Sequence, residues 1–146
     1  MATFEFTITI NRPAADVFKV LTDFGSYKKW QTGVIESTIL SAGAMGVGTR
    51  YRFISEFMGQ KIEAEGEVTA YEQPSKYAWK STKGPFPMQE VTTLESAGAA
   101  TVVKTTVTAE LGGFFKLAEG MVVGQAKKQF DGDYQKLKEM LEAGTL

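Results

Sequence analysis

Cysteine and histidine are both absent from this chain of 146 residues. Their absence excludes disulfides, zinc sites of the usual Cys/His type, Ser-His-Asp triads, cysteine nucleophiles and imidazole acid–base chemistry. A chain without cysteine fits a protein of a reducing compartment, so we expect a cytoplasmic location. We expect no cofactor and no metal.

Strong net charge and long apolar runs are also missing. The formal net charge is −1, so there is no basic field to hold a phosphate backbone, and nucleic-acid binding is not expected. No apolar run approaches the roughly 18 residues of a membrane span. The first five residues lack the basic start and apolar stretch of a signal peptide. The expectation is therefore a mature, soluble, intracellular protein.

The length and the composition are those of one globular domain, which we place at residues 1–146. Apolar residues make up 43% of the chain and charged residues 23%, both close to the average. A chain of this size can bury a core that contains a pocket. We find no internal repeat, linker or low-complexity segment that would divide it.

Alternating apolar and polar residues predict seven strands. Residues 3–10 alternate most cleanly, and Gly59-Gln60 is predicted to be the two-residue turn of a hairpin. Turn residues separate the other runs, so we expect a mostly antiparallel meander. The predicted strands are Thr3–Ile10, Val34–Ser41, Thr49–Met58, Lys61–Tyr71, Tyr77–Thr82, Met88–Glu95 and Thr101–Leu111.

Helices are predicted in three places. Asn11 offers an N-terminal cap and Pro13 suits a first helical turn, so a helix should run to about Leu21. Residues 26–30 form a second short helix that turns Trp30 inward. Residues 113–144 are the one region where apolar residues recur at helical spacing for several turns.

Three motifs give this chain a resemblance to a known superfamily. They are Asn11-Arg12-Pro13-Ala14, the stretch from Asp23 to Trp30, and Gly46-Val47-Gly48-Thr49. The chain resembles the SRPBCC or START-like (pollen-allergen-like, helix-grip) superfamily over its whole length, and its polyketide cyclase/dehydrase branch most closely. The resemblance implies an α+β helix-grip fold, in which a seven-stranded antiparallel sheet curves around a long C-terminal helix, with two short helices between the first two strands. It also implies an apolar cavity between sheet and helix.

Large aromatic residues on one wall and small residues on another favour a pocket over an ordinary core. The strand phases turn the aromatic rings inward, while a neighbouring strand supplies alanine and glycine. The residues that we expect to contact a ligand are Trp30, Tyr51, Phe53, Phe57, Ala64, Gly66, Trp79, Met88, Glu90, Thr92, Thr105, Phe114, Phe115, Met121, Val122 and Gln125.

Glu90 is the sharpest polar signal and the one weak catalytic candidate. If Met88 points inward, period two turns Glu90 and Thr92 inward too, and a carboxylate facing an apolar cavity has a raised pKa. The alternative is a strand frayed after Pro87, with Glu90 in water. No inward Arg, Lys or Asp is evident as a second catalytic group.

Glu63, Glu65 and Glu67 form an acidic stripe on the opposite strand face, with Arg50 and Arg52 facing them across the hairpin. Alternation spaces the carboxylates about 6.5–7 Å apart, which favours a solvated, ion-paired sheet face over a metal site.

Three functions stay open at this point. The first is binding of a small hydrophobic or aromatic ligand, such as a lipid, a polyketide or an isoprenoid-like molecule. The second is a polyketide cyclase or dehydratase in which carboxylate and hydroxyl groups move protons. The third is a protein-interaction module with a vestigial cavity. We favour the first, in a monomer or homodimer.

The long C-terminal helix should not be straight. Its first part groups Phe114, Met121 and Gln125 on one face, and its second part presents apolar residues on a face rotated by more than a quarter turn. Because Gly120 and Gly124 lie where the phase changes and each weakens a helix by about 1 kcal/mol, we predict a kink there. The first part would then be a movable lid and the second part the anchor.

Overall fold

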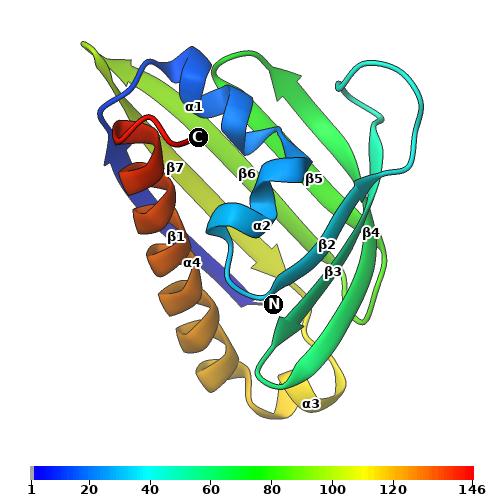
Figure 1. Cartoon of the computed structure of the whole chain (residues 1–146). Coiled ribbons are helices and arrows are strands. Elements are labelled where there is room, and N and C mark those ends of the chain that lie inside the picture. The colour runs from blue at the N-terminus through cyan, green and yellow to red at the C-terminus, as the bar shows by residue number, and fades with distance from the viewer. Residues whose placement is uncertain (1) are drawn as a thin grey trace.

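A computed structural model of the chain describes residues 2–146, apart from the side chain of Phe114. One long helix lies along a curved sheet, and shorter helices lie between the first two strands (Figure 1). The elements in chain order are β1 (Ala2–Ile10), α1 (Ala14–Leu21), the 3₁₀ helix η1 (Phe24–Ser26), α2 (Tyr27–Trp30), β2 (Val34–Ile39), β3 (Arg50–Phe57), β4 (Gln60–Glu72), β5 (Lys76–Lys83), β6 (Met88–Ala97), β7 (Ala100–Ala109), α3 (Gly113–Leu117) and α4 (Glu119–Glu142).

The sheet has seven strands in the order β1-β7-β6-β5-β4-β3-β2, and every neighbouring pair is antiparallel. Strands β2 to β7 form a meander, and β1 joins it beside β7. The sheet curves so that α4 lies along β1, and α1 and α2 lie across the same concave face (Figure 1). The predicted helix-grip architecture is confirmed.

Two local predictions were wrong. The β3–β4 turn consists of Met58 and Gly59, because Phe57 pairs with Gln60 and both intervening residues have positive φ, at 52° and 75°. Positive φ at both positions is the geometry of a type I′ hairpin turn. Helix α1 has Pro13, not Asn11, at its N-cap. The backbone N–H of Asn11 instead donates to a carboxylate oxygen of Glu142 at 2.9 Å, which ties β1 to the end of α4.

The interruption of the C-terminal helix lies earlier than predicted. Ala118, with φ −113° and ψ 29°, separates α3 from α4. Gly120 and Gly124 lie inside α4, and the helix is not interrupted at either glycine. Leu117 at the end of α3 and Met121 in the first turn of α4 point into solvent, where they are 92% and 60% exposed.

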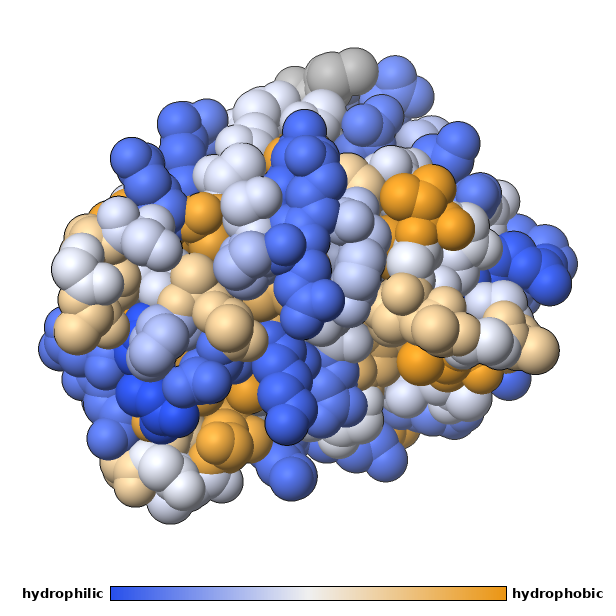
Figure 2. Space-filling model, turned by 90° about the horizontal axis from the view of Figure 1, so that it is seen from above, coloured by the Kyte–Doolittle hydropathy of each residue, from blue (hydrophilic) through white to orange (hydrophobic). Residues whose placement is uncertain are grey.

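The close-packed core lies where α1 and the C-terminal half of α4 meet the sheet. Ile10, Phe18 and Leu137 have no exposed surface there. Seen from above, hydrophobic side chains reach the surface in separate groups between hydrophilic ones (Figure 2). Among the described residues no helix combines the length and the apolar character needed to span a membrane.

The acidic stripe on β4 is an ion-paired sheet face. Arg50 lies opposite Glu67 and Arg52 opposite Glu65, while the Arg52 guanidinium also forms a salt bridge with Glu63. That contact lowers the pKa of the Glu63 carboxyl below its ordinary value. In residues 2–146 no group of three or more Cys, His, Asp or Glu side chains is arranged to hold a metal ion.

Candidate ligand cavity

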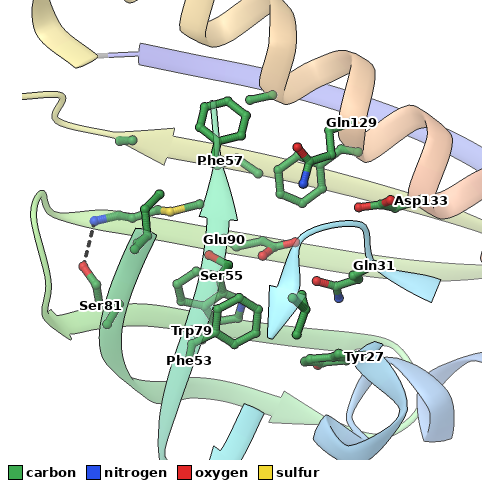
Figure 3. A pocket seen from close by; sticks show the side chains of 18 of the residues that line it. Tyr27, Gln31, Phe53, Ser55, Phe57, Trp79, Ser81, Glu90, Gln129 and Asp133 are labelled. Carbon is green, nitrogen blue, oxygen red and sulfur yellow. Dashed lines mark hydrogen bonds between the residues drawn. The ribbon is translucent and has the colours of Figure 1, made fainter. Parts of the chain in front are cut away.

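A cavity of about 220 Å³ lies between the concave face of the sheet, α2 and the N-terminal half of α4 (Figure 3). Strands β3 to β6 form its floor, and Val122, Val123 and Ala126 of α4 form its roof. The segment between β5 and β6 closes one end through Phe86.

Aromatic rings make up much of the wall, and they brace one another. Trp30 contacts Tyr134 with ring centroids 5.3 Å apart, and Tyr51 meets Trp79 edge to face at 5.9 Å. Near the mouth, Phe57 of β3 contacts Phe115 of α3 at 6.2 Å. The rings that line the cavity are thus held in place by neighbouring rings.

Glu90 projects from the first half of β6 into this space, near Phe53 and Trp79 (Figure 3). β6 begins directly after Pro87 and is not frayed there, since Met88, Glu90 and Thr92 all line the cavity. Burial raises the pKa of the Glu90 carboxyl to about 7, while a hydrogen bond from Trp79, which lies directly opposite on β5, works in the other direction. Near neutral pH this group therefore exchanges a proton easily.

Hydroxyl groups surround this carboxylate. Thr92 and Thr105 share a buried hydrogen bond of 2.9 Å, and both interact with the hydroxyl of Tyr134. Tyr27 donates its hydroxyl proton to the carbonyl oxygen of Leu21. Burial raises the pKa of the Tyr27 and Tyr134 hydroxyls well above the ordinary value, so both stay neutral hydrogen-bonding groups.

Gly66 was expected to contact a ligand, but it has a structural role instead. A Cβ atom at this position would lie 2.5 Å from the hydroxyl oxygen of Tyr51, its partner across β3 and β4, and 2.9 Å from the carbonyl oxygen of Lys80. The Tyr51 side chain thus covers Gly66, as aromatic side chains often do for glycines in β-strands. Gly66 gives its space to Tyr51 and does not line the cavity.

The cavity brings together ten of the residues singled out from the sequence. They are Trp30, Tyr51, Phe53, Phe57, Ala64, Trp79, Met88, Glu90, Thr92 and Val122.

Five of the other six do not line it. Gly66 and Thr105 lie beneath Tyr51 and beside Thr92, and Phe115 is buried behind Phe57 and Phe86. Met121 and Gln125 are exposed because α4 restarts in a different phase, and Gln125 borders a separate, shallow surface hollow. The side chain of Phe114 lies outside the described part of the structure.

Several wall residues were not predicted. Val123, Ala126, Phe130 and Tyr134 recur along one face of α4, which sequence periodicity indicates once the helix is started at Glu119. Gln31 and Thr32 follow α2, and no sequence pattern singles them out. They are placed by α4, because Asp133 accepts a hydrogen bond of 2.9 Å from the Thr32 N–H, and the Gln129 amide donates one of 2.7 Å to the Thr32 carbonyl.

Comparison with known proteins agrees with the family resemblance seen in the sequence. The family model described as "Polyketide cyclase / dehydrase and lipid transport" matches residues 1–142. No curated protein matches the chain.

Solved structures match over nearly their whole length. The protein TTHA0849 from Thermus thermophilus has a TM-score of 0.85 at 20% identity, covering 99% of this chain and 100% of that one. A START superfamily protein from Mycobacterium smegmatis has a TM-score of 0.80 at 17% identity, with 97% of each chain covered. The Zhui aromatase/cyclase from Streptomyces sp. R1128 has a TM-score of 0.75 at 16% identity, covering 99% and 96%. At these identities the likeness is one of fold.

Proposed function

This chain belongs to the polyketide cyclase / dehydrase and lipid transport family, and from that premise we propose that it binds a small hydrophobic or aromatic molecule in the cavity beneath α4. The observation that carries the proposal is the cavity itself, an apolar space of about 220 Å³ walled by braced aromatic rings. At the packing density of protein interiors it holds roughly ten to twelve non-hydrogen atoms. That size favours a small aromatic, a short polyketide or a short isoprenoid over a sterol or a two-chain lipid.

The test is mass spectrometry on protein purified without added ligand. Under native conditions we expect an added mass that disappears from the denaturing spectrum of the same sample. A thermal-shift screen of small aromatic, isoprenoid and acyl compounds then identifies the class, because binding to the native state alone raises the melting temperature. An apo mass together with a flat screen would remove the binding function.

A second function, catalysis of the cyclase or dehydratase type, is favoured by one observation. The Glu90 carboxyl has a pKa of about 7, and it lies inside the cavity with tyrosine and threonine hydroxyls around it. A general acid or base works best when its pKa is close to the operating pH. In this role Glu90 takes a proton from an activated C–H of a poly-β-ketone, or returns one to a leaving hydroxyl.

Glu90→Gln separates the two functions. If Glu90 moves protons, the variant loses turnover of a poly-β-ketone substrate and keeps its affinity for that neutral molecule. Glu95→Gln, an equal change of charge on the outward face of β6, is the matched control. Turnover that survives in Glu90→Gln rules out this residue as the acid or base.

A further inference from the structure

The charged groups that line the cavity all have the same sign. Glu56, Glu65, Glu90 and Asp133 border it, and none of the described lining residues is Lys or Arg. Three of these carboxylates are accounted for by the protein or by water. Glu65 forms an ion pair of 3.7 Å with Lys83, Asp133 accepts the Thr32 N–H, and Glu56 is exposed at the rim.

Glu90 differs because no cation faces it from any described element packed around it. The ionisable groups whose charge it senses are all tyrosines, one from each neighbouring element: Tyr27 of α2, Tyr51 of β3, Tyr77 of β5 and Tyr134 of α4. Val107 lies directly opposite it on β7, and Thr105 lies opposite Thr92, the next inward residue of β6. A carboxylate that is buried without a positive partner is costly, and the ligand is the one component that can supply that partner.

An anionic ligand is the worst fit to this arrangement. A fatty acid or a phosphate would place a second negative charge beside Glu90 in an apolar space, with no Lys or Arg on the described wall to balance either group. A neutral ligand fits better, but it leaves the ionised carboxylate with no positive charge. A cation removes the imbalance.

The walls add a second feature that favours a cation. Phe53 and Trp79 lie close to Glu90 in Figure 3, Trp79 is its direct cross-strand neighbour, and Phe57 lines the same cavity. An ammonium group is attracted to the face of an aromatic ring within about 6 Å of the ring centre, most strongly to that of tryptophan. A carboxylate in a cavity lined by aromatic rings is the combination that recognises alkylammonium groups.

We infer that the molecule held in this cavity is a small aryl-alkyl amine, with its ammonium group against the Glu90 carboxylate and its ring between the aromatic walls. The inference rests on the proposed binding function and narrows it to one ligand class. A positively charged ligand also keeps Glu90 ionised in the complex.

Three isosteric probes test this: 3-phenylpropylamine, 3-phenylpropan-1-ol and 3-phenylpropanoate, each of about the ten non-hydrogen atoms that the cavity holds. They differ at one end only, as cation, neutral hydroxyl and anion. Isothermal titration calorimetry at pH 8 should rank the amine above the alcohol by about tenfold or more, as expected for a charge-assisted hydrogen bond, with the anion weakest. At pH 5, where Glu90 takes up a proton, the affinity for the amine should fall toward the affinity for the alcohol.

Two variants complete the design. Glu90→Gln should erase the advantage of the amine and leave the affinity for the alcohol within about twofold, since glutamine keeps the size of the side chain and can still hydrogen-bond. Glu95→Gln lowers the net negative charge equally from the outer face and should keep the wild-type ranking. Circular dichroism confirms that both variants are folded.

The possible failures are distinguishable. If the alcohol or the anion binds as tightly as the amine, or if Glu90→Gln keeps the preference for the amine, the amine inference is overturned and the apolar-ligand function stands. If none of the three probes binds and the purified protein carries no added mass, both fail.

Discussion

The two ends of the space between the sheet and α4 are built from similar apolar and aromatic residues, yet one end is filled and the other is hollow. At the filled end, Val17 and Phe18 of α1 meet Leu137 and Leu141 of α4, all with 1% exposure or less. At the hollow end α4 passes over the same sheet and leaves the cavity beneath Val122 and Ala126. The concave face is continuous, so the difference lies in what covers it.

Side-chain size and the number of layers explain the contrast. Helix α1 adds a third contributor at the filled end, and the leucines of α4 reach down to the sheet. At the hollow end the third contributor is the short helix α2, and α4 offers valines and an alanine toward the space that Ala64 of β4 also lines. Interiors are normally packed to crystal density, so an unfilled region kept open by small residues has the character of a site.

The largest effect should come from emptying the filled end. Leu137→Ala removes a fully buried side chain, and we expect it to lower the free energy of unfolding by about 3 kcal/mol, since the loss of transfer energy adds to a new cavity. Val123→Ala, on the same helix but above the existing cavity, should cost about 1 kcal/mol or less, because one side of this valine already faces a void. Urea unfolding measures both. Equal losses would show that the two ends are packed alike.

Glu90→Gln should raise the free energy of unfolding, and the size of this gain should depend on pH. The folded-state pKa of about 7 lies above the ordinary 4.5, so the folded protein binds this proton more tightly than the unfolded chain. The contribution of the Glu90 carboxyl to the stability of the wild type is therefore fully present below pH 4.5 and is lost as the pH rises to 7. At pH 8 the variant should be more stable by up to about 3 kcal/mol, a pKa difference converted at about 1.4 kcal/mol per unit.

The shape of the pH dependence is the decisive readout. The two proteins should converge near pH 4.5 and diverge toward pH 8 in urea unfolding, while Glu95→Gln should follow the wild type throughout. A constant offset between Glu90→Gln and the wild type at every pH would mean that Glu90 acts through packing and not through its charge.

The filled end and the strand phases were accessible from sequence, and the hollow end was accessible only in part. Alternation along 88–94 indicates that Glu90 shares a face with Met88 and Thr92, because successive side chains of a strand point to opposite faces. The α4 wall was missed because a helix has a continuous phase, and an interruption at Ala118 shifts every later residue. The face predicted from Phe114 onward took in Met121 and Gln125, but the face of α4 that lines the cavity is centred near Val123 and Ala126, so both residues were placed on the wrong face.

Gly66 shows a second limit of sequence analysis. A small residue on an inward strand face indicates open space, but the space is filled by whichever neighbour is long enough to cross the strand pair. Here Tyr51 fills it, with the hydroxyl directly above the glycine. Its hydroxyl has no hydrogen-bond partner within the described structure, so packing alone holds the ring. A one-dimensional pattern does not carry this cross-strand information.

Gly66→Ala should therefore destabilise the protein by about 1–3 kcal/mol, the usual cost of overpacking. The new methyl group would displace the Tyr51 ring, which contacts Trp79 on the cavity wall. In a Tyr51→Ala background the same substitution should cost less, with the part due to the Lys80 carbonyl oxygen remaining, and the double-mutant cycle gives the coupling directly. Additive effects of the two substitutions would contradict the placement of Tyr51 over Gly66.

The smallest change in stability should come with the largest loss of binding. Ala126→Leu extends a side chain from the roof of the cavity into empty space, and each added methylene that is buried contributes about 0.8 kcal/mol, which offsets the rotamer entropy that leucine loses. We expect unfolding free energy within about 1 kcal/mol of the wild type, together with loss of 3-phenylpropan-1-ol binding in calorimetry. Gln125→Leu places the same side chain one residue earlier on the exposed face of α4, so it should keep binding. If Gln125→Leu abolishes binding and Ala126→Leu does not, the ligand lies outside the cavity, and the contrast between the two ends of α4 reflects folding alone.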